Sequence, residues 1–147
     1  MVALFYVLSF VTAPAQTNLS HLKSWIGKYP TDQEAKPVRK FFNVPEIQGQ
    51  LKRLLTKKDF SHLTQELEVQ SPIELVRRFL VIKVCRAHWC PADNAMLVIN
   101  LEDGVCYVGF YQNYENKSVT RWFSSKEEYT ELPDEILDDF LHMHKPK

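Results

Sequence analysis

The segment from residue 95 to residue 111 constrains the fold most, because it has the pattern of two strands joined by a tight turn. Asp103-Gly104 is a favoured two-residue hairpin sequence, and it lies between two runs of alternating apolar residues. The expected pairs are Leu101 with Cys106, Ile99 with Val108, and Leu97 with Phe110, and these apolar side chains share one face. A slip of one residue would mix the two faces, so the register is well specified.

Further strands and a helix are predicted around this hairpin. The β-branched run from Phe79 to Val84 favours a strand, although Ser71-Pro72-Ile73-Glu74 upstream would also serve as a helical capping box. A third strand, Val119 to Phe123, follows the hairpin. Pro133 to Leu141 has an acidic first turn and one apolar side, which is typical of a helix.

Helices are also expected before the sheet. Ile47, Leu51, Leu54 and Leu55 recur at helical spacing after Pro45, a residue suited to the first helical position. Asp59 can cap a second short helix. The order of helices, antiparallel strands and a last helix predicts an α+β fold, in which helices pack on one face of an antiparallel meander.

The N-terminal residues 1–15 resemble a secretory signal peptide. Met1 to Ala13 is apolar, and Ala13-Pro14-Ala15 has the small-x-small pattern of a cleavage site. The alternative is a buried strand or helix of the domain. We expect cleavage before Gln16, one domain over residues 16–147, and a periplasmic or secreted location. Elsewhere the sequence has no apolar run long enough to cross a bilayer.

A short loop between two predicted strands contains two of the three cysteines. Cys106 lies on the apolar hairpin face and is better interpreted as a buried free thiol. Cys85 and Cys90 are then left to pair, closing a ring that contributes about 2 kcal/mol in the loop-closure model. The larger effect expected is the ordering of His88, because a pre-ordered loop loses less entropy on binding.

Several interpretations of this loop compete. It can be a binding loop with His88 at its tip and Arg86 or Trp89 as anchors, since Trp and Arg are common interface hot spots. The alternative is a structural disulfide beside an incidental solvated histidine.

Metal binding and catalysis are weaker interpretations. A zinc site formed by Cys85, His88 and Cys90 would need a fourth ligand from His142 or His144, and the spacing is not a usual zinc pattern. No Cys-His-Asn arrangement points to a catalytic cysteine. The sequence therefore predicts no enzyme, no metal and no cofactor.

The pattern Cys85-x-x-His88-x-Cys90, entered from a strand and followed by an apolar hairpin, resembles the proteinaceous inhibitors of vertebrate (C-type) lysozyme, the Ivy family. The resemblance covers Phe79 to Leu141. It implies a periplasmic, non-enzymatic inhibitor with an antiparallel sheet and flanking helices. It also implies that the cysteine-closed loop places His88 in the lysozyme cleft, with Arg86 and Trp89 as supports.

The loop departs from the family pattern at three positions. Arg86, Ala87 and Trp89 stand where the family commonly has Lys, Pro and an acidic or amide residue. The missing proline loosens the loop, and Trp89 adds bulk beside His88. The alternative is therefore an exported binding or immunity protein of the same fold, directed at another cell-wall hydrolase.

The partner expected from the sequence is C-type lysozyme or a related peptidoglycan hydrolase. Lys plus Arg number 18 and Asp plus Glu number 18, which gives a formal net charge of zero and argues against a nucleic-acid partner. No membrane association is expected, and a homodimer is compatible with the sequence.

Overall fold

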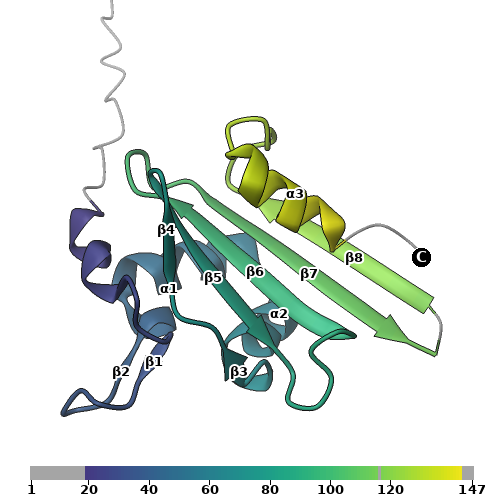
Figure 1. Ribbon diagram of the computed structural model, residues 1–147, viewed down its shortest axis with the longest axis horizontal. Coiled ribbons are helices and arrows are strands. Elements are labelled where there is room, and N and C mark those ends of the chain that lie inside the picture. Colours follow the sequence, from purple (N-terminus) through teal and green to yellow (C-terminus); the bar gives the residue numbers. More distant parts are fainter. Residues whose placement is uncertain (1–18, 116, 144–147) are drawn as a thin grey trace, which may run out of the picture.

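A six-stranded antiparallel sheet runs through the computed structural model, which describes residues 19–115 and 117–143 (Figure 1). The strand order is β3-β5-β6-β7-β8, and β4 pairs with the same strand β5 as β3 does. The strands are β3 (Val69–Gln70), β4 (Glu74–Val76), β5 (Phe79–Cys85), β6 (Asp93–Asn100), β7 (Cys106–Tyr114) and β8 (Lys117–Ser124). The predicted α+β class with an antiparallel meander is confirmed.

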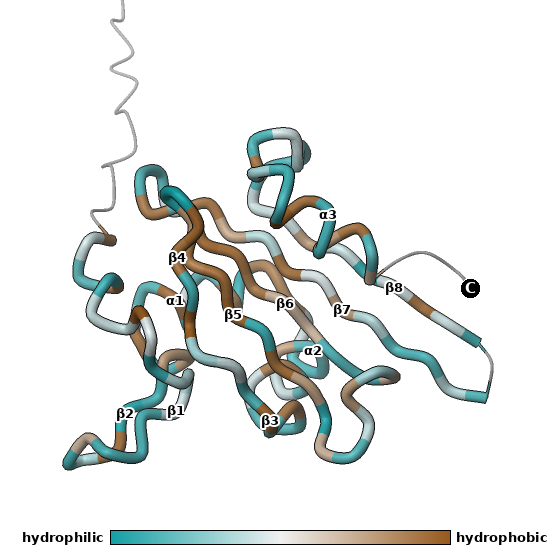
Figure 2. The backbone as a smooth tube through the Cα atoms, in the orientation of Figure 1, coloured by the Kyte–Doolittle hydropathy of each residue, from teal (hydrophilic) through white to brown (hydrophobic). Residues whose placement is uncertain are grey.

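The helices before the sheet cover one of its faces. They are η1 (Ser20–Trp25), η2 (Phe41–Asn43), α1 (Pro45–Leu54), α2 (Lys57–Ser61) and a π-helical turn, η3 (His62–Glu66). A two-stranded sheet, β1 (Thr31–Asp32) and β2 (Arg39–Lys40), lies between η1 and η2 in the sequence. The apolar stripe of α1, with Ile47 and Leu51, packs in one cluster with alternate residues of β5, β6 and β7. Apolar residues follow the middle of these strands in Figure 2.

The last helix, α3 (Asp134–His142), corrects one detail of the prediction, because it covers the opposite face of the sheet. Ile136 and Phe140 pack there in a second cluster. Its strand residues point to the other face of the sheet from those of the first cluster, and they include Val81, Val98 and Tyr107. In the centre of the sheet the side chains on both faces are apolar, so each face must be covered by other elements. The single-face arrangement of helices is therefore wrong, and the sheet lies between two helical layers (Figure 1).

The predicted hairpin register is also wrong, by two residues. Ile99 pairs with Cys106, rather than Leu101 with Cys106. Residues 101–105 form a longer loop, because the Leu101 N–H donates to the carbonyl of Arg78 at 3.0 Å, outside the hairpin. A tight type I′ turn needs positive φ at both central residues, and only Gly104 of this pair has it. A shift of two keeps every side chain on its predicted face, so the apolar set is confirmed.

The short helix α2 differs from the prediction at its N-terminus. Thr56 is its N-cap and accepts a hydrogen bond from the Asp59 N–H at 3.1 Å. Asp59 lies inside the first turn, and its buried carboxylate pairs with Arg121 of β8. Residues 1–15, which resemble a signal peptide, lie outside the described residues. Within the described ranges, no helix has the length and apolarity needed to cross a membrane.

Candidate functional site

The loop that joins β5 to β6 lies at the lower end of the sheet in Figure 1. Cys85 and Cys90 form a disulfide with their Cα atoms 4.8 Å apart, as the sequence predicts. Inside this ring, the Trp89 N–H donates to the Arg86 carbonyl at 3.0 Å, which closes a four-residue turn. Asp93 N–H donates to the Trp89 carbonyl at 2.8 Å, so the return to β6 is also hydrogen-bonded. The loop is held from both ends.

His88 is the third residue of this turn and is exposed to solvent. Its φ is 66°, in the left-handed region that residues other than Gly seldom occupy, although His, Asn and Asp tolerate it better than most. A positive φ at the third position of a turn is typical of type II turns. The conformation costs about 1–2 kcal/mol relative to ordinary backbone, so the closed ring must hold it in place.

Trp89, which follows His88 in the sequence, lies near a second exposed aromatic residue, Tyr114. Trp89 is 53% exposed and Tyr114, near the end of β7, is 42% exposed. Their ring centroids are 6.4 Å apart. The hydroxyl of Tyr114 donates to the buried carboxylate of Asp93 at 2.6 Å, which fixes that ring from behind. Exposed aromatic rings with a fixed orientation are the side chains that contribute most at protein interfaces.

Arg86 is turned inward, toward the base of the loop. Its Nε donates to Asp93 Oδ2 at 2.6 Å and its Nη2 donates to Glu66 Oε2 at 2.8 Å. Its backbone N–H also donates to the Asp93 carbonyl at 2.9 Å. Asp93 is fully buried, so it needs these partners to keep its charge. The structure therefore gives Arg86 an internal bond network; its contact with a target stays a prediction.

His62 completes this network behind the loop. Its Nε2 lies 2.9 Å from Asp93 Oδ1 and its Nδ1 lies 3.1 Å from Glu66 Oε2. The ring is also 5.8 Å from that of Phe110, measured between centroids. Residues from η3, the loop, β6 and β7 thus meet at the base of the loop.

The electrostatics of this network keep both carboxylates ionised. Burial raises the pKa of Asp93, but hydrogen bonds from Tyr114 and Arg86 and the nearby His62 outweigh it and hold that pKa below its usual value. The hydrogen bond from His62 is the largest cause that lowers the pKa of Glu66. The loop is therefore anchored on two negative charges at neutral pH.

Sequence reasoning missed His62, Glu66, Asp93 and Tyr114. A signal was present for Asp93, because it has the same parity as Ala95, Leu97 and Ile99 in β6. A carboxylate on an apolar strand face requires buried partners. The i,i+4 spacing of His62 and Glu66 indicated one pair, but nothing local indicated that the pair lies beneath the loop.

The weaker interpretations of the loop find no further support. Cys85 and Cys90 are bonded to each other, and no group of three or more His, Cys, Asp or Glu in the described ranges could hold a metal ion. His142 lies at the end of α3, and His144 is outside the described residues. Cys106 is a free, buried thiol as predicted, and burial raises its pKa to about 12, so it is a poor nucleophile at neutral pH.

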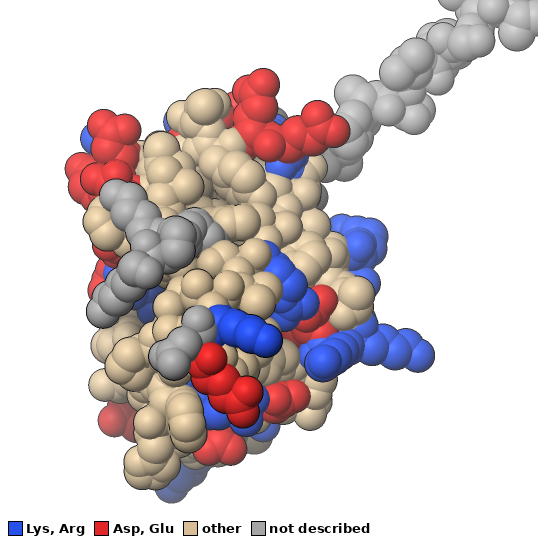
Figure 3. All heavy atoms as spheres, turned by 90° about the vertical axis from the view of Figure 1, so that its right-hand side faces the viewer, with Lys and Arg blue, Asp and Glu red and all other residues tan. Residues whose placement is uncertain are grey.

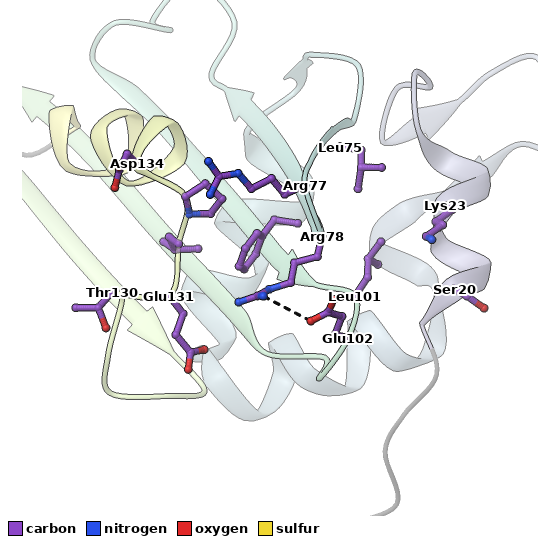
Figure 4. A pocket seen from close by; sticks show the side chains of 13 residues that line it. Ser20, Lys23, Leu75, Arg77, Arg78, Leu101, Glu102, Thr130, Glu131 and Asp134 are labelled. Carbon is purple, nitrogen blue, oxygen red and sulfur yellow. Dashed lines mark ion pairs between the residues drawn. The ribbon is translucent and has the colours of Figure 1, made fainter.

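A cavity of about 720 Å³ lies at the opposite end of the sheet (Figure 4). Its walls come from the β4–β5 turn, the β6–β7 loop and the segment before α3. Arg78 pairs with Glu102 at 3.6 Å across its edge, and Arg77 lies 3.9 Å from Glu135. Figure 3 shows the side of the molecule that lies on the right in Figure 1, and Lys and Arg side chains lie there among Asp and Glu side chains. The cavity is separate from the loop.

These features define a loop-presenting α+β domain, in which a disulfide-closed turn with exposed side chains rests on a buried ionic network. The sequence model of the family described as "Inhibitor of vertebrate lysozyme (Ivy)" matches residues 46–146, and the chain belongs to this family. The match begins in α1, well before the part in which the sequence showed the resemblance. No individual curated protein matched the chain, and no solved structure did.

Proposed function

We propose that the chain is an exported, non-enzymatic inhibitor of C-type lysozyme that inserts its disulfide-closed loop into the active-site cleft. Membership of a lysozyme-inhibitor family supports the target. The observation that carries the mechanism is the exposed His88, held at positive φ between two bonded cysteines.

The chemistry of the target explains why a histidine suits this position. A retaining glycosidase has two carboxyl groups about 5–5.5 Å apart on either side of the scissile bond, and lysozyme is the type case. A protonated imidazole has two N–H donors on opposite sides of one small ring. It can donate to both carboxyl groups, and each of these bonds is strengthened by charge. The inhibitor needs no catalytic group and no cofactor.

The residues beside His88 form the rest of the contact surface. Trp89 and Ala87 flank it in the loop, and the Tyr114 ring extends the surface from β7. Water is excluded from the histidine when such neighbours pack against the cleft walls. Arg86 acts as a support from inside, through Asp93 and Glu66.

A second candidate is an exported binding or immunity protein directed at another cell-wall hydrolase. The exposed Trp89 favours it, because an indole beside the histidine needs more room than the small polar residue common in the family. A hydrolase with a wider cleft would accept both side chains. A panel of wall hydrolases tested for inhibition separates the two candidates.

The decisive experiment is calorimetry with C-type lysozyme, using wild type, His88→Asn and His88→Ala. Asparagine tolerates positive φ, so His88→Asn removes the imidazole with little backbone strain, whereas His88→Ala removes it and adds strain. We expect His88→Asn to weaken binding by about 2 kcal/mol or more, about 30-fold, as for a central hot spot.

The matched control is His21→Asn, which changes an exposed histidine of η1. It should leave the affinity unchanged. Binding should also compete with an oligosaccharide substrate, because both occupy the cleft. Equal affinities for wild type and His88→Asn would remove His88 from the interface. Absence of binding by every variant would reject lysozyme as the target.

A further inference from the structure

We propose that His62 is a positioning residue for the loop, and that its protonated ring links Glu66 and Asp93 so that both carboxylates hold Arg86 at the loop base. The inference rests on the proposed function, because it assigns a support to the same loop. It adds a residue outside the loop and a dependence of loop order on the protonation of that residue.

The four side chains form a closed ring of hydrogen bonds. His62 contacts Asp93 at 2.9 Å and Glu66 at 3.1 Å, and Arg86 contacts the same two carboxylates at 2.6 Å and 2.8 Å. Each anion is thus shared between one histidine and one arginine. Of the four residues only Arg86 belongs to the loop. The other three, from η3 and β6, form the site that binds its guanidinium group.

Both ring nitrogens of His62 face carboxylate oxygens, and only the protonated imidazole can donate to both of them. The cation has two N–H donors, whereas the neutral ring has one donor and one acceptor. In the neutral ring, one nitrogen lone pair would face a carboxylate lone pair. The closed ring of bonds therefore belongs to the protonated state.

Burial decides which bond is lost when the proton leaves. The Asp93 side chain is 0% exposed, so it has no access to water in exchange for the histidine donor. The Glu66 side chain is 45% exposed and can be hydrated. We expect the neutral ring to keep its N–H on Asp93 and to release Glu66, which then holds Arg86 less firmly.

Other charged and polar groups around His62 come from three further elements. Asp59 of α2 lies close enough for His62 to contribute to lowering its pKa, although burial is the largest influence on that carboxyl and raises the pKa. Arg121 of β8 pairs with Asp59, and Lys58 lines the same small cavity. The Gln112 amide of β7 lies 3.3 Å from Nε2. The positive charges of Arg121 and Lys58 and the N–H donor of Gln112 disfavour a protonated His62, whereas the negative charge of Asp59 favours it.

The test is amide hydrogen exchange of the loop in the free protein, compared between about pH 5 and about pH 8. Exchange is expressed as a protection factor, which removes the intrinsic pH dependence. The reporters are the amides of Trp89, Ala92 and Asp93, which are all hydrogen-bonded within the loop. We expect their protection to fall about tenfold as pH rises, the size expected for one charge-assisted hydrogen bond.

Two variants should abolish this dependence. His62→Gln removes the imidazole, and Glu66→Gln removes the carboxylate that is released. Glu66 is exposed, so Glu66→Gln should fold even if His62→Gln does not. His88→Asn is the control for the loop's own histidine and should keep the full tenfold change. Unchanged wild-type protection over this range would overturn the proposal. So would a pH dependence that persists in Glu66→Gln or disappears in His88→Asn.

The outcome is separable from the identity of the target, because the exchange measurement needs no lysozyme. If loop protection follows pH as expected but lysozyme does not bind, the positioning role stands and the target is wrong. If lysozyme binds through His88 and loop protection is flat, the inhibitor function stands and His62 is not a positioning residue. Wild-type affinity at the two pH values, compared with that of Glu66→Gln, then measures how far loop order contributes to binding.

Discussion

Removing the disulfide by the double substitution Cys85→Ser and Cys90→Ser should separate the stability of the fold from the order of the loop. The bond closes a ring across a sequence separation of 5 residues. Loop closure of that length contributes about 2 kcal/mol to the free energy of unfolding, a modest share of an ordinary domain's stability. The protein should therefore still fold. The backbone bonds of Arg86, Trp89 and Asp93 remain without the disulfide, so the loop should loosen rather than unravel.

The affinity for lysozyme should fall about tenfold, or about 1.4 kcal/mol, because the looser loop loses more entropy when it binds. Denaturant unfolding and calorimetry measure the two effects. Alkylation of reduced wild type is a second route, since Cys106 is buried, its pKa is raised to about 12, and it should stay unlabelled. An unchanged affinity would show that the ring does not order His88. Loss of folding would show that the ring supports the core.

Three further predictions concern stability and processing. Tyr107→Phe should leave the protein as stable or raise the free energy of unfolding by about 1 kcal/mol, because the Tyr107 hydroxyl is buried without a hydrogen-bond partner among the described residues; a clear loss of stability would contradict this. The pKa of Asp93 is lower in the folded than in the unfolded chain, so the stability that it contributes is full above about pH 4 and is lost as pH falls further. The free energy of unfolding, plotted against pH, should therefore have a different slope below that pH in wild type and in Asp93→Asn. N-terminal sequencing of the protein from its host should begin near Gln16, and a mature chain that retains Val2 would show that the segment is not a signal peptide.

The sequence predicted the elements better than their arrangement. The alternation in β6 and β7 indicated which side chains share a face, because successive residues of a strand point to opposite faces whatever the register. The register depended on the turn, where a backbone bond from Leu101 to Arg78 outweighed the local preference of Asp103-Gly104. The position of α3 could not be predicted, because its apolar side fits either face of a sheet whose central strands are apolar on both.

The candidate site shows the same division. The disulfide and the exposed His88 follow from the spacing of three cysteines and the apolar hairpin face. The partners of Arg86 do not, since Glu66 and Asp93 come from separate elements and meet only after the chain has folded. A sequence pattern shows that an arginine is present in the loop, but not whether it turns outward to a target or inward to a buried acid.

The inward course of Arg86 separates the loop into a tip and a base with different tolerances to mutation. The base is built by η3, β6 and β7, so its residues constrain one another. Within the described residues, the side chains at the tip positions 87 and 89 make no hydrogen bond or ion pair, and Trp89 has only a ring contact with Tyr114. Substitutions at these two positions would therefore change the outer surface of the loop without altering the bonds that hold its base. A library randomised at Ala87 and Trp89 would explore such changes in the laboratory.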